Sequence, residues 1–195
     1  MPYCGKELSY VSPCIRLKLV YLNQMRARKT KTFRLDSAFL DELEVEAENQ
    51  GISVNRLSER VLERYINHTR WVDRMDSVTI HSLTIKSVFD KLDDDQLFEL
   101  GDSLGARVPH ENFLMRGISV DDVMARYLVE NVLGGYDHWF SVSYHDHSRP
   151  YFYIRSTNGD NWLLFVEAYL KAFYRENLGR DVECIRTYHS IQILL

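Results

Sequence analysis

The residue types best suited to binding a metal ion gather in one short segment. His145 and His147 flank Asp146, so two imidazoles would share one side of the chain if this segment is a β-strand. Zinc and nickel sites use such nitrogen ligands. The same histidines also lie beside a predicted turn, where polar side chains are expected. We therefore expect no metal site, with His145 and His147 as the candidates if one exists. Further possible ligands are dispersed along the chain: His110, His138, Cys184 and His189.

Residues that could act as a nucleophile and its base are few. Cys184 and His189 could face each other across a predicted hairpin, as an activated thiol requires. Cys184 also shares a strand face with Val182 and adjoins Ile185, which favours a buried structural thiol. The sequence has no glycine-rich phosphate loop, no Gly-x-Ser-x-Gly elbow and no His-Glu-x-x-His motif. We therefore expect neither an enzyme nor a cofactor.

A series of aromatic residues between positions 136 and 153 has two interpretations. Aromatic side chains can line a pocket for a small molecule, or they can form the core and interfaces of a sheet. The sequence alone leaves both open. The residues are Tyr136, Trp139, Phe140, Tyr144, Tyr151, Phe152 and Tyr153.

The charges are divided unevenly along the chain. The net charge of the 195 residues is −4, but residues 1–35 contain eight basic side chains and only one acidic side chain. Residues 76–195 contain 18 acidic and 11 basic side chains. A basic arm beside an acidic body indicates a local contact with a polyanion, and a solvated N-terminus is the alternative.

Residues 30–35 alternate in a way that is typical of a β-strand. Thr30, Thr32 and Arg34 share one face, and Phe33 and Leu35 share the other. One short strand cannot bury its own apolar face, whereas the same strands of two copies can pair as an antiparallel ribbon. A two-stranded ribbon fits the major groove of DNA, where arginine can bind guanine through two hydrogen bonds.

Two helices are predicted after this strand. Asp36 or Ser37 is a suitable N-cap for a helix over residues 37–50, and Gly51 is a suitable residue to end it. Residues 53–55 can cap a second helix over residues 55–67. The apolar positions recur at helical spacing in both: Leu40, Leu43 and Ala47 in the first, and Leu57, Val61, Leu62 and Tyr65 in the second.

This order of strand, helix, turn and helix resembles the ribbon-helix-helix (CopG/MetJ/Arc-type) family of DNA-binding proteins. The resemblance covers roughly 40 of the 195 residues. It implies an obligate dimer that binds operator DNA through its ribbon. By position, the residues that contact bases would be Thr30, Thr32 and Arg34. The residues that contact phosphates would be Lys29, Lys31, Ser53, Val54 and Asn55.

The remaining residues predict a mixed domain of helices and strands. Helical patterns lie at 82–92, 94–105 and 120–133, and a short strand is possible at 77–80. Strand patterns at 138–145 and 150–156, a helix at 161–177 and a hairpin at 182–194 then follow. We therefore predict an α+β chain whose last part has the order β-β-α-β-β, with a helix packed on an antiparallel sheet.

These observations define three segments. Residues 1–28 are a basic extension, residues 29–75 a ribbon-helix-helix domain, and residues 76–195 an α+β domain for oligomerisation or ligand sensing. Three widely spaced cysteines argue against a secreted disulfide framework. No signal peptide and no membrane span is predicted. The cytoplasm is therefore the expected compartment.

The function predicted from the sequence is that of a dimeric, sequence-specific DNA-binding transcriptional regulator, most simply a repressor. Its expected partners are double-stranded DNA and further copies of itself, as a homodimer or a higher even-numbered oligomer, with no membrane partner. The alternative is a dimerisation module whose C-terminal domain binds a protein, a small molecule or a metal. The effector is not predictable from the sequence.

Overall fold

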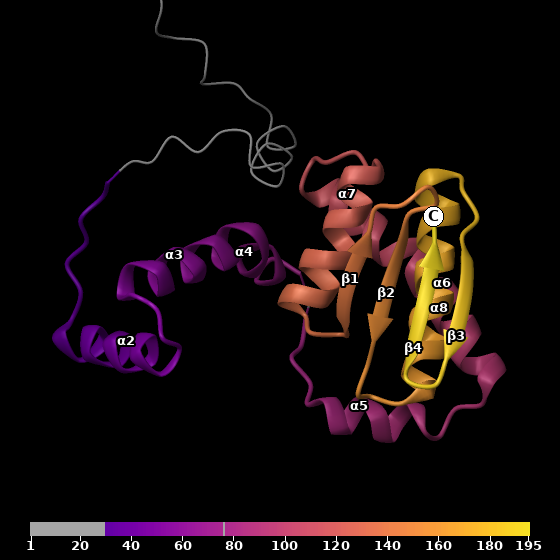
Figure 1. Ribbon diagram of the computed structural model, residues 1–195, viewed down its shortest axis with the longest axis horizontal. Helices are drawn as coiled ribbons and strands as arrows, with labels where there is room; N and C mark the ends of the chain where they lie inside the picture. Colours follow the sequence, from indigo (N-terminus) through magenta and orange to yellow (C-terminus); the bar gives the residue numbers. More distant parts are fainter. Residues whose placement is uncertain (1–29, 76) are drawn as a thin grey trace, which may run out of the picture. The chain divides into compact units, whose positions relative to one another are not determined.

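The computed structural model describes residues 30–75 and 77–195 (Figure 1). These residues belong to two compact units, one ending at Ser77 and one continuing from Val78 to Leu195. In these two ranges, no helix is both long and apolar enough to cross a lipid bilayer. Lys29, which the resemblance places at a phosphate, lies outside the described residues.

The unit that ends at Ser77 is built from two successive helices. Helix α2, Ser37–Asn49, begins at the N-cap Asp36, whose side chain accepts the N–H of Ala38 at 2.9 Å. Gly51, with φ of +64°, ends it in the left-handed conformation that glycine adopts at low cost. Helix α3, Val54–Arg64, begins at the N-cap Ser53. Both predicted helices are present.

The second helix extends further than predicted. After α3, the chain continues as the π-helix η1, Tyr65–Thr69, and the short helix α4, Arg70–Val72. The predicted end near residue 67 was wrong. Asn67 and His68 are buried within η1, and the chain remains helical to Val72. Residues 30–36, before α2, have no regular secondary structure, so the strand at 30–35 stays a prediction.

The unit that starts at Val78 opens with helices. They are α5, Ser82–Phe89; α6, Asp94–Met115; α7, Asp122–Tyr127; and the π-helix η2, Leu128–Tyr136. The predicted strand at 77–80 was wrong, since these residues have no regular structure. Helix α6 begins with a capping box between Asp93 and Gln96 and runs ten residues beyond its predicted end at residue 105.

A four-stranded antiparallel sheet follows, with the spatial order β1-β2-β4-β3. The strands are β1, Ser141–His145; β2, Tyr151–Arg155; β3, Glu183–Thr187; and β4, Ser190–Leu194. Helix α8, Asp160–Leu178, connects β2 to β3. The predicted order β-β-α-β-β is confirmed, and the chain is α+β.

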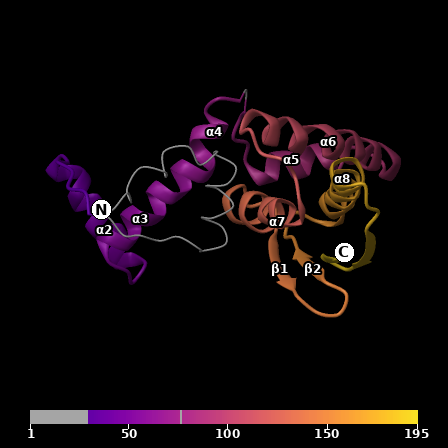
Figure 2. The ribbon, with the colours of Figure 1, turned by 90° about the horizontal axis from the view of Figure 1, so that it is seen from above.

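Helix α8 lies on one face of this sheet, and α6 packs against the other side of α8 (Figures 1 and 2). Alternate residues of the central strands β2 and β4 point into the core between the sheet and α8. Phe152, Ile154, Ile191 and Ile193 are fully buried there. Residues between them, such as Tyr153 and Gln192, face the other side. Period-two burial of this kind sets the register of the sheet, because a shift by one residue would expose the apolar side chains.

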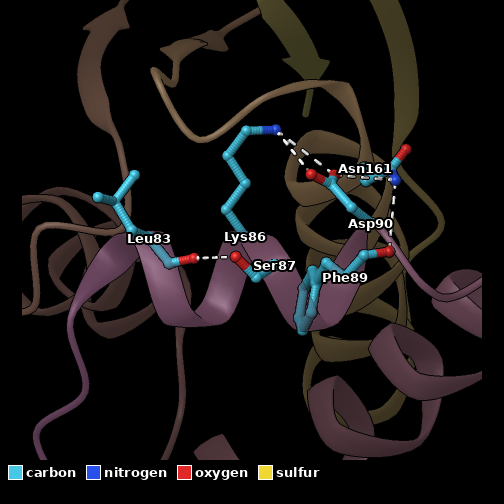
Figure 3. A network of polar contacts seen from close by, with 6 residues as sticks. All are labelled: Leu83, Lys86, Ser87, Phe89, Asp90 and Asn161. Atoms are coloured by element: carbon cyan, nitrogen blue, oxygen red, sulfur yellow. Dashed lines mark hydrogen bonds and ion pairs between the residues drawn. The ribbon is translucent and has the colours of Figure 1, made fainter.

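A small set of polar contacts joins the end of α5 to the start of α8 (Figure 3). The amide nitrogen of Asn161 donates to the carbonyl oxygen of Phe89 at 3.3 Å and lies 3.5 Å from a carboxylate oxygen of Asp90. The ammonium group of Lys86 donates to the same carboxylate at 3.1 Å. Within α5, the Ser87 hydroxyl donates to the carbonyl oxygen of Leu83 at 2.8 Å.

Two glycines let α6 approach α8 closely. A Cβ atom at Gly101 would lie 2.5 Å from the carbonyl oxygen of Phe165 and 2.8 Å from the Cβ of Ala168. A Cβ at Gly105 would overlap the backbone of Tyr169. Gly101 and Gly105 are therefore packing residues inside α6.

We expect Gly105→Ala to destabilise the protein by about 1–3 kcal/mol, because the overlap with Tyr169 outweighs the ~1 kcal/mol by which alanine favours a helix. Equilibrium unfolding in guanidinium chloride measures this difference. Ser103→Ala, at an exposed position of the same helix, is the control and should change stability by no more than about 0.5 kcal/mol. Unchanged or increased stability of Gly105→Ala would contradict the close contact.

Candidate functional site

The residues predicted to contact bases are all accessible. Thr30, Thr32 and Arg34 are exposed, as is Lys31 between them. Within the described residues, the Arg34 guanidinium has no hydrogen bond and no ion pair. A guanidinium with free donors can bind two acceptors on one base edge or one phosphate.

The start of α3 presents backbone donors. The Ser53 hydroxyl accepts the N–H of Arg56 at 3.2 Å, and the Ser53 carbonyl oxygen accepts the N–H of Leu57 at 3.0 Å. In the described part of the chain, the N–H groups of Val54 and Asn55 have no acceptor. The cap is therefore Ser53 rather than Asn55. Free N–H groups at the positive end of a helix are suited to an anion such as phosphate.

The predicted base and phosphate residues remain separate in the single chain. No hydrogen bond or ion pair joins residues 30–35 to Ser53, Val54 or Asn55 among the residues that the structure describes.

The same two helices leave most of their apolar side chains uncovered. In α2 and α3 only Ala47 and Leu57 are buried. Phe39 is 69% exposed and Val61 is 55% exposed. The other exposed apolar residues of this unit are Phe33, Leu35, Leu40, Val45, Leu62, Tyr65 and Ile66. We call these nine residues the apolar surface of the α2–α3 unit.

The two candidate metal-binding histidines are neighbours but form a ring stack. The ring of His145 lies 4.7 Å from that of Tyr151, and the ring of His147 lies 6.1 Å from that of His145. The Nε2 atom of His145 is 3.0 Å from the Ser143 hydroxyl. In residues 30–75 and 77–195, no three His, Cys, Asp or Glu side chains converge as a metal site would require.

The remaining candidate ligands lie on separate elements. His110 on α6 contacts Asn177 at 3.2 Å, and His189 in the β3–β4 turn lies 3.7 Å from an Asp160 carboxylate oxygen. His138 precedes β1. The fold therefore does not bring the dispersed residues together.

Cys184 and His189 do not form a pair. The register of the hairpin places Cys184 opposite Ile193, whereas His189 lies in the turn. Cys184 packs against the core, and burial raises the pKa of its thiol to about 12. The nearby Glu167 carboxylate raises the pKa further, and Lys171 opposes this effect. The interpretation as a structural thiol is therefore the better one.

The sequence does not indicate the open pocket, about 320 Å³ in volume, that the structure forms. Its residues come from the starts of α6 and α8 and from the end of β3, which are far apart in the sequence. They are Asp94, Asp160, Asn161, Leu164, Arg186, Thr187 and Tyr188. None belongs to the aromatic series 136–153, in which Phe140 and Phe152 are buried in the core. No local motif could have revealed this pocket, because only tertiary packing joins its parts.

We expect Cys184 to react slowly with alkylating reagents. In the variant Cys4→Ser/Cys14→Ser it is the only thiol, and a raised pKa leaves little of the reactive thiolate. At pH 8 the rate with iodoacetamide should be at least about 100-fold lower than that of a thiol with pKa near 8.5. The rate should still rise at pH 10. The same variant unfolded in guanidinium chloride is the control, and a folded protein whose rate levels off near pH 9 would contradict the burial argument.

Comparison with known proteins adds no relative. No protein-family model matches this sequence, and no curated protein and no solved structure shows significant similarity to it. Inferences about function therefore rest on the residues and geometry described above.

Proposed function

We propose that this chain is a sequence-specific DNA-binding transcriptional regulator that acts as a dimer of the ribbon-helix-helix type. The observation that carries the proposal is the apolar surface of the α2–α3 unit. It includes Phe33 and Leu35 of an exposed segment, residues 30–35, that has strand-like alternation and the basic side chains Lys31 and Arg34.

The apolar surface is best covered by a second copy of the same unit. Two buried side chains, Ala47 and Leu57, are too few to form a core for the helices α2 and α3. Fully burying one large apolar side chain contributes about 1.5–3 kcal/mol relative to leaving it exposed. Nine such residues would therefore favour association by more than the cost of joining two molecules.

A second copy would also complete the hydrogen bonds of residues 30–35. A single extended segment has unpaired backbone N–H and C=O groups, and the same segment of another copy can pair with it in antiparallel orientation. In such a ribbon, Phe33 and Leu35 would face the helices. Thr30, Thr32 and Arg34 of both copies would then form the opposite face, towards the bases in the major groove.

Phosphate groups would be held by charge and by backbone donors. Lys29 precedes Thr30 and Lys31 lies between Thr30 and Thr32, and the free N–H groups of Val54 and Asn55 follow the cap Ser53. These contacts would fix the position of the protein on the duplex without selecting a sequence. The acidic residues of α2 require that this helix face away from the phosphates. They are Asp41, Glu42, Glu44, Glu46 and Glu48.

Residues 78–195 would act as the second part of the regulator. They form a separate compact unit with its own core, which can contribute further association or bind an effector.

A stable dimer without affinity for DNA at low salt would instead support the alternative function, in which the α2–α3 unit only dimerises and residues 78–195 bind a protein, a small molecule or a metal.

The association can be tested at Val61. We expect Val61→Lys to weaken the dimer by at least about tenfold, because it places a charge on the surface that the second copy covers. Sedimentation equilibrium of the full chain measures the dissociation constant. Leu114→Lys is the matched control, since Leu114 is 63% exposed and belongs to the other unit. A monomeric wild type, or equal effects of both variants, would refute the proposed interface.

Base recognition can be tested at Arg34, after a binding site has been selected from random DNA. Arg34→Ala should reduce the difference in binding free energy between the selected site and random DNA by roughly 1–3 kcal/mol, as expected for the loss of one bidentate contact to guanine. Fluorescence anisotropy at fixed salt measures both affinities. Arg107→Ala, at an exposed ion pair on α6, is the control. Equal losses on selected and random DNA would assign Arg34 to the phosphates instead.

A further inference from the structure

The pocket at the starts of α6 and α8 contains charges of both signs that do not neutralise each other. Arg186 lies at the end of β3, whereas Asp94 and Asp160 are the first residues of α6 and α8. Among the described residues, neither Arg186 nor Asp94 has an ion-pair partner within 4.0 Å, whereas Asp160 lies 3.7 Å from the Nδ1 atom of His189. Opposite charges at the wall of one pocket are therefore held apart rather than joined.

The fold explains this separation. Each aspartate lies in the first turn of a helix, where the positive end of the helix dipole stabilises a carboxylate. The backbone N–H of His189 donates to Asp160 at 3.4 Å, which ties the β3–β4 turn to the start of α8. Arg186 follows Cys184 on the same side of β3, so its position is set by the sheet rather than by the helices.

Polar and apolar groups complete the wall. The amide nitrogen of Asn161 points to α5, while its oxygen points away from that helix (Figure 3). Leu164 lies one helical turn further along α8 and adds an apolar patch. Tyr188 also lines the pocket; it is 81% exposed, and its ring lies 3.8 Å from that of His189.

We infer that this pocket binds a small zwitterion of the α-amino acid class. The carboxylate of the ligand would bind the guanidinium of Arg186, and its ammonium group would bind the carboxylates of Asp94 and Asp160. A simple anion would meet two carboxylates, and a simple cation would meet the arginine. Only a molecule with both charges satisfies both parts of the wall, and a volume of about 320 Å³ is sufficient for an amino acid.

This inference goes beyond the proposed regulation of transcription and does not depend on it. The pocket lies entirely within the unit that starts at Val78, and its residues are distinct from those proposed to contact DNA. Binding of an amino acid can therefore be measured whether or not the protein binds an operator.

The test uses the full chain and the common protein amino acids, each at roughly 10 mM, a concentration at which weak ligands still shift the unfolding temperature. We expect at least one to raise it, with a dissociation constant then measured by calorimetry. The matching amine without the carboxylate, and the matching acid without the amine, should each bind at least about tenfold more weakly.

Substitutions separate the pocket from nonspecific charge effects. Arg186→Met and Asp94→Asn should each weaken binding of the same amino acid by at least about tenfold. Arg155→Met, on β2, and Asp95→Asn, next to Asp94 but outside the pocket, are the matched controls and should leave it unchanged. The inference is overturned if no amino acid binds. It is also overturned if the amine or the acid alone binds as tightly as the amino acid, or if the control variants weaken binding as much as the pocket variants.

Discussion

The close crossing of α6 and α8 is the contact on which the unit from Val78 to Leu195 depends. Gly101 and Gly105 let the backbone of α6 reach that of α8 near Phe165 and Tyr169. Residue numbers rise together along this contact, so the two helices run in the same direction. Their positive ends therefore lie on the same side, and both begin with an aspartate, which is how Asp94 and Asp160 come to line one pocket.

The sheet is organised around the same helix pair. Helix α8 follows β2 and precedes β3, yet β4 lies between these two strands in the sheet. The apolar side chains of the central strands and of α8 form one continuous core, in which Phe152, Leu170 and Ile193 are fully buried. A core of this size accounts for a unit that is compact by itself.

The α2–α3 unit, in contrast, has few buried side chains. Its helices have good caps at Asp36 and Ser53, so local interactions are enough to define where they begin. Among residues 30–75 and 77–195, most of their apolar side chains remain exposed. An amphipathic helix gains most of its stability from packing, and the dimer proposed above would supply that packing. The exposed apolar side chains that limit the stability of the single unit are also the ones that the proposed dimer would bury.

Local sequence signals were sufficient for most element positions. The alternation at 150–156 and 182–194 predicted strands that are present, and the predicted cap at Asp36 or Ser37 gave the start of α2 correctly. The errors share a cause. The helices predicted to end at residues 105 and 67 both continue further, and in both cases the residue at the predicted end is buried.

The sequence by itself determined the α+β class, the order of the strands along the chain and the exposed basic segment before α2, because period and capping depend on neighbouring residues. Only the tertiary structure decided the spatial order β1-β2-β4-β3, the separation of Cys184 from His189 and the existence of the pocket. These features join residues that are far apart in the chain, and such contacts are selected by packing over the whole unit, which no local pattern encodes.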